Sequence, residues 1–321
     1  MITLNEKYVR SKIVKRTRTA HKGDFGKVLI FAGSEGMAGA AVLCGRAALR
    51  SGAGLVRYLL PSSGSRLQNI LQISVPEATC VTYSEDMDFS EYSAIACGCG
   101  LGKGRNASHI LKAILKRYDG LLVLDADALN MIAASNNMIS LVQSSQAMII
   151  MTPHPGEAKR LLGHDLETVS KEPGQIPGQY TLFDPAEKQE NDLPHPDREL
   201  KKDTDWTDPD DRLAVLNRLS EKYYSIIVLK GCGTLVGTTE NTFINTTGNP
   251  GMATGGSGDV LTGIIAALGG QGYKPIDCAA CGVYVHGLAG DKAASKNSEI
   301  GMTSSDIIDM LPSAWKEVYP S

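Results

Sequence analysis

The chain lacks the features that would place it in several large classes of protein. Its 321 residues carry a net charge of only −3, so no overall field points to nucleic acid or a membrane as a partner. The one basic cluster, residues 7–22, is typical of a solvated face. No uncharged apolar run reaches membrane-spanning length, and the first residues lack the apolar core of a signal peptide. We therefore expect a cytoplasmic protein.

The cysteines do not follow the spacing of a metal site or a disulfide framework. There are seven, an odd number, and several lie in apolar stretches. Cys97-Gly-Cys99 is too tight for the usual zinc spacing, and Cys278-Ala-Ala-Cys281 has no second pair. The pattern favours free thiols that serve as small core residues in a reducing compartment.

Short aliphatic runs alternate along the chain with longer helical patterns. Several of the short runs are apolar at consecutive positions, as in strands that are buried on both faces. This alternation predicts an α/β protein with a mostly parallel central sheet, helices on both faces, and ligands at the carboxyl ends of the strands. The expected strands are 27–31, 55–60, 93–96, 121–124, 147–151, 225–229, 235–236 and 242–245, and the expected helices are 38–51, 107–117, 156–162, 211–223, 259–268, 275–296 and 304–316.

One segment interrupts this alternation. Between about residues 165 and 210 the periodicity disappears, and six of the chain's 14 prolines lie there among many charges. The segment holds too few apolar residues to bury a core, so we expect a long surface insertion within a single domain that spans 1–321. Asp208-Pro-Asp-Asp211 is typical of the start of the following helix.

The most informative segment is a glycine-rich loop, Asn249-Pro-Gly-Met-Ala-Thr-Gly-Gly-Ser-Gly-Asp259, which is followed by an apolar helix. The first turn of that helix presents free N–H groups, and the loop residues 255–258 let the backbone wrap around an anion. Asp259 is then placed to deprotonate a hydroxyl while the N–H groups stabilise a phosphoryl group. The same pattern also suits a purely structural turn, because Asp is common at helix starts.

Two other glycine-rich loops follow expected strands. The spacing Gly33-x-x-Gly36-x-x-Gly39 is not the dinucleotide-binding fingerprint, and no acidic residue follows it at the required distance. It suits either the close approach of a ligand or a tight strand-to-helix turn. Gly98-Cys-Gly-Leu-Gly-Lys-Gly104 offers a second close backbone approach.

Polar side chains stand at the ends of two buried strands. Asp125 and Asp127 follow the strand 121–124, and a buried carboxylate is costly unless it is paired or bound to a metal ion. We interpret Asp125 as an orienting or Mg²⁺-linked group and Asp127 as a helix cap. In Thr152-Pro-His-Pro-Gly-Glu157, two prolines stiffen the turn and hold His154 in one geometry, which favours contact with a ligand.

Two later segments have both a functional and a structural interpretation. Lys230-Gly-Cys-Gly-Thr234 follows an apolar strand, so Lys230 could reach a nucleotide phosphate, although a simple turn fits as well. The small residues of His286-Gly-Leu-Ala-Gly-Asp291 indicate close helix packing beneath the glycine-rich loop rather than chemistry.

Taken together, these segments resemble the ADP/ATP-dependent NAD(P)H-hydrate dehydratase family in its single-domain bacterial form. The resemblance covers about 21–311, apart from the insertion. Nine ordered blocks carry it: His21-Lys-Gly, Gly33-Ser-Glu-Gly-Met-Ala-Gly-Ala-Ala, Arg50-Ser-Gly-Ala-Gly-Leu-Val, Pro76-Glu, Gly100-Leu-Gly, Asp125-Ala-Asp-Ala-Leu-Asn, Pro153-His-Pro-Gly-Glu, Leu229-Lys-Gly-Cys-Gly-Thr and Gly248-Asn-Pro-Gly-Met-Ala-Thr-Gly-Gly-Ser-Gly-Asp.

The resemblance implies a ribokinase-like three-layer α/β/α sandwich and a nicotinamide-repair reaction. The S-form of NADH-hydrate or NADPH-hydrate would be dehydrated at the expense of ADP, or less favourably ATP, with Mg²⁺. Asp259 would be the catalytic base, with Gly256 and Gly258 in the anion cradle. By motif match, the hydrate would contact Ala40, Gly102, His154 and Asp259. The nucleotide would contact Lys230, Gly231, Cys232, Gly233, Thr234 and Gly258.

The resemblance also bears on partners and on departures from the family pattern. Relatives suggest a homotetramer, and the companion epimerase is expected on a separate chain, since only about 20 residues precede His21. Ser257 keeps a hydroxyl where relatives often have Thr. The insertion after Gly163 is unusual for the family.

Two competing functions share parts of these motifs. A kinase for a thiazole or pyrimidine alcohol would have the same fold and the Gly-Gly-Ser-Gly-Asp loop, but not the Pro153–Glu157 and Gly33–Ala41 blocks. A non-catalytic nucleotide sensor would use the fold for binding only, although the intact loop and Asp259 argue against it.

Overall fold

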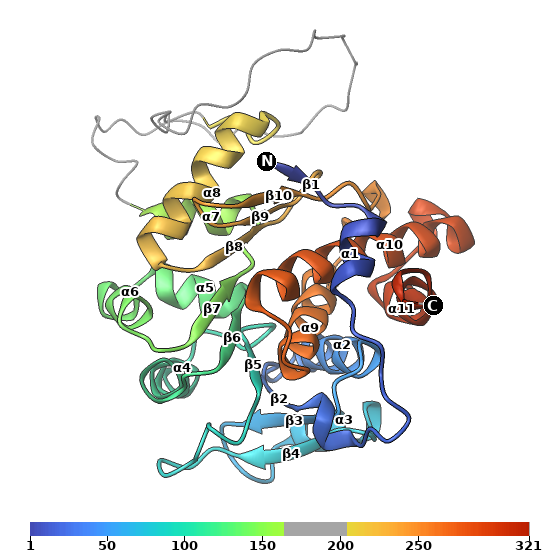
Figure 1. The fold of residues 1–321 in the computed structure, drawn as a ribbon. Coiled ribbons are helices and arrows are strands. Elements are labelled where there is room, and N and C mark those ends of the chain that lie inside the picture. The colour runs from blue at the N-terminus through green and yellow to red at the C-terminus, as the bar shows by residue number, and fades with distance from the viewer. Residues whose placement is uncertain (164–203, 321) are drawn as a thin grey trace, which may run out of the picture.

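One ten-stranded sheet runs through the part of the chain that the computed structural model describes, residues 1–163 and 204–320 (Figure 1). The seven neighbouring strands from β8 to β4 are parallel, β9 pairs antiparallel with both β8 and β10, and β1 pairs parallel with β10. In spatial order the strands are β1 (Ile2–Thr3), β10 (Thr242–Ile244), β9 (Leu235–Gly237), β8 (Ile226–Leu229), β7 (Met148–Met151), β6 (Leu121–Leu124), β5 (Ala94–Cys97), β2 (Lys27–Phe31), β3 (Leu55–Leu60) and β4 (Thr79–Thr82).

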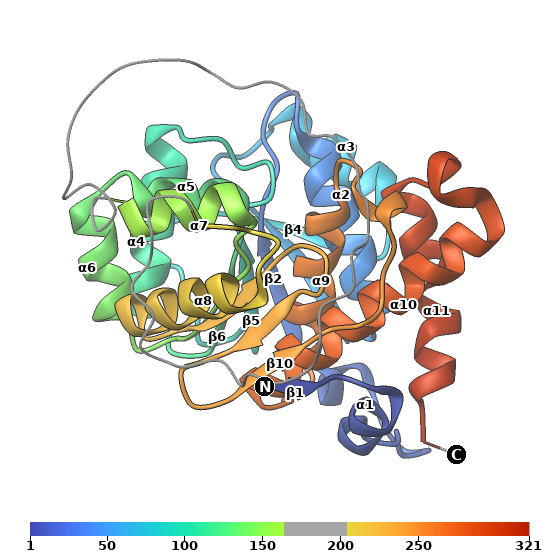
Figure 2. The ribbon, with the colours of Figure 1, turned by 90° about the horizontal axis from the view of Figure 1, so that it is seen from above.

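Helices cover both faces of the sheet and complete three layers (Figure 2). On one face lie α4 (Arg105–Arg117), α5 (Ala126–Ala133), α6 (Asn136–Gln143), α7 (Pro155–Leu162) and α8 (Pro209–Tyr223). On the other lie α1 (Glu6–Lys12), α2 (Ala38–Arg50), α3 (Arg66–Ser74), α9 (Ser257–Gly270), α10 (Pro275–Gly301) and α11 (Ser304–Val318). The three-layer α/β/α sandwich and the mostly parallel sheet that the sequence predicts are confirmed.

Helix α9 lies at the centre of its layer, where it packs against the sheet and is flanked by α2 and α10. All of its residues from Val260 onward are buried, as expected of a helix that is apolar on every side. Gly263 permits its close contact with α2, because a Cβ there would lie 2.1 Å from the carbonyl oxygen of Cys44. This packing fixes the direction in which the N-terminus of α9 points.

The expected elements match the structure closely in the central sheet. The predicted strands 27–31, 55–60 and 121–124 have the same bounds as β2, β3 and β6, and the other five agree to within one residue. Helix α9 begins at Ser257, two residues earlier than predicted, so Asp259 is its third residue rather than its first. The short elements β1, β4, α1, α3, α5 and α6 were not predicted.

The predicted insertion lies almost wholly outside the described residues, because the structure describes nothing between 163 and 204. The predicted start of the following helix is confirmed. Asp208 caps α8 by accepting a hydrogen bond from the N–H of Asp210, and Pro209 occupies the first helical position. Within the described ranges, no helix combines the length and hydropathy that a membrane span requires.

Candidate active site

The loops that the sequence singles out meet at one edge of the sheet. The strands β2, β5, β6, β7 and β8 run parallel, so their carboxyl ends lie at the same edge. The segments that follow these five strands are 32–37, 98–104, 125, 152–154 and 230–234. The N-terminus of α9 joins them there, since its loop contacts groups at the ends of β6 and β8. The predicted convergence of the motifs is thereby confirmed.

The glycine-rich loop before α9 has a conformation that only glycine supports. Gly256 is the N-cap of α9 and has φ +93°, and a Cβ there would lie 2.3 Å from Leu43 Cδ1. The hydroxyl of Ser304 donates a hydrogen bond of 2.8 Å to the carbonyl of Gly255. The loop therefore has a fixed conformation. The free N–H groups in the first turn of α9 point toward the loop.

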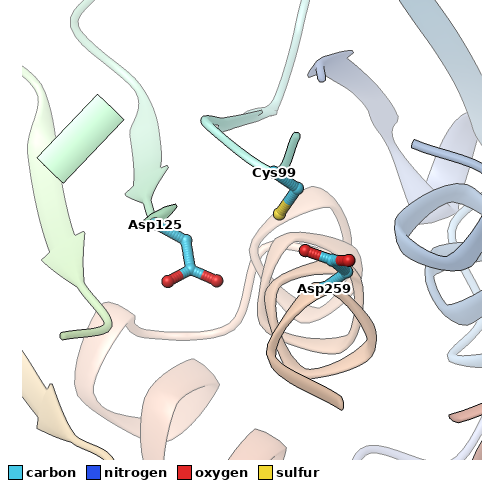
Figure 3. Close-up of side chains that lie close together, drawn as sticks. All are labelled: Cys99, Asp125 and Asp259. Atoms are coloured by element: carbon cyan, nitrogen blue, oxygen red, sulfur yellow. The ribbon is translucent and has the colours of Figure 1, made fainter. Parts of the chain in front are cut away.

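Asp259 lies in this first turn and faces two other reactive groups. One ligand-type atom each from Asp259, Asp125 and Cys99 lies within 4.8 Å of the other two (Figure 3). Burial, followed by the charge of Asp125, raises the pKa of Asp259 to about 6. A carboxylate whose pKa lies near neutrality can accept a proton from a hydroxyl and is still largely ionised at pH 7.

Asp125 and Lys230 form a buried ion pair beneath the loop. Lys230 Nζ lies 2.7 Å from Asp125 Oδ1, and the hydroxyl of Thr262 donates to Asp125 Oδ2 at 2.9 Å. Burial by itself would raise the pKa of Asp125, but the charge and hydrogen bond of Lys230 outweigh it, so the pKa is lowered. Asp125 raises the pKa of Lys230 against the effect of burial. Both groups are therefore charged at neutral pH.

This ion pair changes the interpretation of Lys230. The ammonium was predicted to reach a nucleotide phosphate, but it lies between Asp125 and Glu157, whose Oε2 is 3.8 Å away. A Cβ added to Gly258 would be 3.2 Å from Lys230 Nζ, so the charge lies directly under the first turn of α9. Its positive charge therefore adds to the positive end of the helix dipole at the start of α9.

The turn from Lys230 to Thr234 is held by an arginine that the sequence did not reveal. Arg212, on α8, donates hydrogen bonds to the carbonyls of Cys232 and Leu229. Its side chain is buried, with only 7% of the residue exposed. A sequence signal was available, because Arg212 shares the apolar face of α8 with Val215, Leu216 and Leu219 at helical spacing, and a cation on such a face needs partners.

His154 lies at the carboxyl end of β7 and is half-exposed, with 49% of its side chain accessible. It caps α7, since its Nδ1 accepts a hydrogen bond of 3.0 Å from the N–H of Gly156. Its Nε2 lies 3.4 Å from Glu157 Oε1. Burial lowers the pKa of His154 even though Glu157 opposes the shift. The imidazole ring of His154 is therefore neutral at pH 7. It lies at the edge of the site and is held in place by its contact with Glu157.

Gly102 lies in the loop after β5, and Ala40 lies just beyond the loop after β2; these two loops are hydrogen-bonded to each other. The N–H of Gly33 donates to the carbonyl of Cys99, and the hydroxyl of Ser34 donates to the carbonyl of Gly100, at 2.8 and 2.9 Å. Ala40, in the first turn of α2, packs against the second of these loops. The loops after β2 and β5 therefore form one continuous wall of the site.

Asp127 does not cap a helix as predicted. The N-cap of α5 is Asp125, whose side chain makes no capping bond. Asp127 Oδ2 instead accepts a hydrogen bond of 2.8 Å from the N–H of Gly102. The reason is that the strand ends at Leu124 and the chain turns at once into α5, which directs Asp127 across to the neighbouring loop. It holds in place one of the residues expected to contact substrate.

Helix α10 supports the loop from below, as its small residues suggest. A Cβ at Gly287 would lie 2.2 Å from Thr247 Oγ1, so the helix and the loop are in close contact. Asp291 accepts hydrogen bonds from the N–H of Gly248 and the side-chain amide of Asn249. His286 Nε2 lies 3.3 Å from Ser257 Oγ. The predicted packing is confirmed, and the two polar residues add specific anchors.

The cluster of Cys99, Asp125 and Asp259 is a poor site for Mg²⁺, although it is the one group of possible metal ligands found among the described residues. Both carboxylate oxygens of Asp125 already accept hydrogen bonds. The third group is a thiol, whereas Mg²⁺ requires oxygen ligands in octahedral geometry. Of the two expectations for Asp125, an orienting role or a link to Mg²⁺, its pairing with Lys230 and Thr262 favours the first.

The fold and this edge define a class of α/β protein in which a glycine-rich loop and a neighbouring carboxylate lie at the carboxyl ends of parallel strands. A family model described as NAD(P)H-hydrate dehydratase matches residues 28–175 and 193–313. The chain belongs to this family.

Individual relatives agree with this assignment. A bifunctional NAD(P)H-hydrate repair enzyme of Moorella thermoacetica is 34% identical over 96% of this chain and 53% of its own length. An ADP-dependent (S)-NAD(P)H-hydrate dehydratase of Neisseria meningitidis is 33% identical over 86% of this chain and 80% of its own length.

A solved structure has the same fold. The ADP/ATP-dependent NAD(P)H-hydrate dehydratase of Bacillus subtilis, co-crystallised with ATP and Mg²⁺, superposes with a TM-score of 0.73 at 25% identity, covering 99% of this chain and 98% of that one. The chain spans about half the length of the bifunctional relatives it matches.

Proposed function

We propose that the protein catalyses the ADP-dependent dehydration of (S)-NADH-hydrate and (S)-NADPH-hydrate to NADH and NADPH, with ATP as the less favoured donor. The hydrate carries a hydroxyl on its reduced nicotinamide ring, and hydroxide is a poor leaving group. Transfer of a phosphoryl group from ADP to this hydroxyl leaves AMP. Phosphate then departs with the C–O bonding electrons, pushed by the lone pair of the ring nitrogen, and loss of a neighbouring ring proton completes the dihydropyridine.

The observation that carries this proposal is the position of Asp259. Its carboxylate lies in the first turn of α9 beside the glycine-rich loop, and burial raises its pKa to about 6. In this position it can remove the proton of the ring hydroxyl as the oxygen attacks phosphorus. The N–H groups before it, including those of Gly256 and Gly258, can stabilise the phosphoryl group in transit.

The nucleotide would lie over the turn from Lys230 to Thr234. Gly231 and Cys232 are exposed, and neither Gly231 nor Gly233 has a side chain that would keep a ligand from the backbone. Arg212 holds the turn from behind, and the Lys230 ammonium provides positive charge under the loop. We therefore assign residues 230–234 and Gly258 to the nucleotide.

The hydrate would lie against the wall formed by the loops after β2 and β5. Ala40 and Gly102 present small surfaces there, and the half-exposed ring of His154 closes the side next to β7. Asp259 lies between this wall and the nucleotide turn, which is the arrangement that transfer between two bound ligands requires.

Mg²⁺ belongs to the proposal as a companion of the nucleotide phosphates. The Bacillus subtilis neighbour was crystallised with ATP and Mg²⁺, and phosphoryl transfer commonly uses this ion with only one or two protein carboxylates. We further propose that the protein works in the cytoplasm as a homo-oligomer, a tetramer, and that an epimerase activity supplies the S-form. Sedimentation velocity of the purified protein tests the oligomeric state.

The direct test is the recovery of NADH from its hydrate. Purified protein is mixed with NADH-hydrate, Mg²⁺ and either ADP or ATP, and the near-ultraviolet absorbance of NADH is followed. We expect recovery with ADP, slower recovery with ATP and none without nucleotide. The variant Asp259→Asn should lose on the order of 10²–10⁴-fold in turnover while it retains nucleotide affinity, and Asp119→Asn, an exposed carboxylate, serves as the control.

Each outcome of this test has a definite meaning. Recovery that depends on nucleotide and on Asp259 supports the dehydratase. Absence of recovery with either nucleotide, from folded protein, contradicts it and leads to a screen of thiazole and pyrimidine alcohols as phosphoryl acceptors. Unchanged turnover in Asp259→Asn would remove Asp259 from the mechanism.

A further inference from the structure

A buried thiol lies next to the proposed base. Cys99 follows β5 and is only 1% exposed, on the side of the sheet that carries α2 and α9. Its Sγ lies within 4.8 Å of a carboxylate oxygen of Asp259 and points toward that carboxylate in Figure 3. The proposed reaction does not use this thiol, and the hydrate and nucleotide surfaces assigned above do not include it.

The backbone around Cys99 leaves its side chain little freedom. Its carbonyl accepts the hydrogen bond from the N–H of Gly33, and Gly98 and Gly100 on either side have φ of +127° and +56°. On the side of α2, the thiol of Cys44 is a close neighbour of Cys99. The backbone contact with Gly33 and the neighbouring Cys44 thus restrict the thiol. Asp259 is its polar neighbour on the side of the glycine-rich loop.

The protonation state of Cys99 makes it a donor. The neighbouring thiol of Cys44, burial and the nearby carboxylates of Asp259 and Asp125 raise the pKa of the Cys99 thiol well above its usual range. The group is therefore S–H at neutral pH, and a thiol proton within reach of a carboxylate favours the ionised form of that carboxylate.

We propose that Cys99 is a positioning residue for Asp259, whose thiol donates a hydrogen bond to the carboxylate and fixes the direction in which its free oxygen faces the substrate hydroxyl. The inference rests on the proposed role of Asp259 as the base. Among the described residues, Cys99 is the one side chain that acts on Asp259 through a hydrogen bond, so in its absence the direction of the carboxylate would be set less firmly. Pre-organisation of this kind is what general-base catalysis in a rigid site requires.

Several charged or titratable groups face Asp259 from the elements packed around it. Asp125 and Asp127 raise its pKa, while Lys230 lowers it from the end of β8. From α10, His286 contacts the neighbouring Ser257, and burial lowers the pKa of that ring to about 4, so it is neutral. Among these groups Cys99 is the one whose hydrogen bond favours the ionised carboxylate directly.

The first experiment observes the thiol itself and needs no substrate. The S–H stretching band in the infrared lies where other protein groups do not absorb, and the difference between wild type and Cys99→Ala isolates the band of Cys99. We expect this band to shift as Asp259 is protonated near pH 6 and to shift permanently in Asp259→Asn. A Cys99 band that is independent of pH and unchanged in Asp259→Asn would overturn the inference, whatever reaction the protein performs.

The second experiment follows the pH dependence of kcat/KM. Cys99→Ala removes the hydrogen-bond donor, which should raise the pKa of Asp259. The acidic limb of the kcat/KM profile should therefore move to higher pH by about 0.5–1 unit, and kcat should fall more than KM changes. Cys99→Ser keeps a donor and should return the limb toward its wild-type position. A residue with a merely structural role would lower activity at all pH values without moving the limb.

Cys97 provides a matched control two residues away. It is equally buried, but it lies in β5 and packs on the opposite face of the sheet, in the core with α4 and α5. Cys97→Ala should lower stability without moving the acidic limb or the Cys99 band. If Cys97→Ala and Cys99→Ala shift the limb alike, the effect is one of core packing and the inference fails, while the dehydratase activity itself would still stand.

Discussion

Lys230 Nζ lies 2.7 Å from Asp125 Oδ1, and this pair joins the ends of two strands beneath the proposed anion-binding loop. Glu157, which follows the strand between them, lies 3.8 Å from the same ammonium. One buried cation therefore holds together the ends of β6, β7 and β8. It also places a positive charge below the first turn of α9.

Removal of this cation should be costly. In Lys230→Met the carboxylate of Asp125 stays buried without its counter-ion, so we expect the free energy of unfolding to fall by about 3–5 kcal/mol. Urea denaturation measures the change. Lys116→Met, at an exposed position of α4, should alter it by no more than about 0.5 kcal/mol. A loss for Lys230→Met as small as that of the control would show that the pair is not buried in solution.

The activity should depend on pH through Asp259. The pKa of its carboxyl is raised to about 6, and the base must be ionised to accept a proton. We expect kcat/KM to rise roughly tenfold per pH unit below about 6 and to level off above it, because this parameter reports the free enzyme. A profile measured with saturating ADP at constant ionic strength tests this. A limb near pH 4 would contradict the effect of burial on Asp259.

Gly256 and its neighbour Gly255 should respond differently to the same substitution. Gly256 has φ +93° and a Cβ there would overlap Leu43, whereas a Cβ added to Gly255 would have no neighbouring atom within 4 Å. Gly256→Ala should therefore destabilise the protein by at least about 2 kcal/mol, and Gly255→Ala by roughly 0.5 kcal/mol or less. Thermal unfolding of the two variants makes the comparison. Equal losses would mean that the loop adopts another conformation in solution.

His286 should make stability depend on pH in the acidic range. Burial lowers the pKa of this ring from 6.5 to about 4, so between these values the unfolded chain binds a proton that the folded protein does not. The contribution of His286 to the free energy of unfolding is present in full above about pH 6.5. It declines by about 3 kcal/mol as the pH falls to about 4.

The variant His286→Gln removes this titration and keeps a polar group next to Ser257. It should lose less stability than wild type between pH 7 and pH 5, as measured by urea denaturation at both values. His21→Gln, at an exposed site, is the control. The same loss in wild type and His286→Gln would assign the acid sensitivity to other residues.

The central part of the fold could be predicted because its strands are buried on both faces. Runs such as Leu121–Leu124 have apolar residues at every position, and flanking turn residues mark their ends, so the bounds of β6 were correct. The short edge strands were not predictable in this way. Thr79–Thr82 is exposed or half-exposed, and it becomes a strand only because β3 offers it a partner.

The backbone loops that form the site could be predicted from the sequence. The pairing of its side chains could not. Glycine spacing located the loop before α9, and Asp259 was assigned as the base. The pairing of Lys230 with Asp125 depends on two strands being neighbours in space, which no local pattern states. The place of Arg212 on the apolar face of α8 was a local signal that was missed, but its partners, main-chain carbonyls on another element, could not be read from any local pattern. The prediction that Asp127 caps a helix was wrong because the chain turns into α5 directly after Leu124.

The contacts that build the candidate site join parts of the chain that are far apart in sequence. Ser34 and Gly100 are 66 residues apart, Asp125 and Lys230 are 105 apart, and Asp125 and Thr262 are 137 apart. Contacts of such long range form late, after the entropy of closing large loops has been lost. A refolding chain should therefore regain its helices well before it regains a competent site, and no fragment that ends before α9 should bind the anionic ligand.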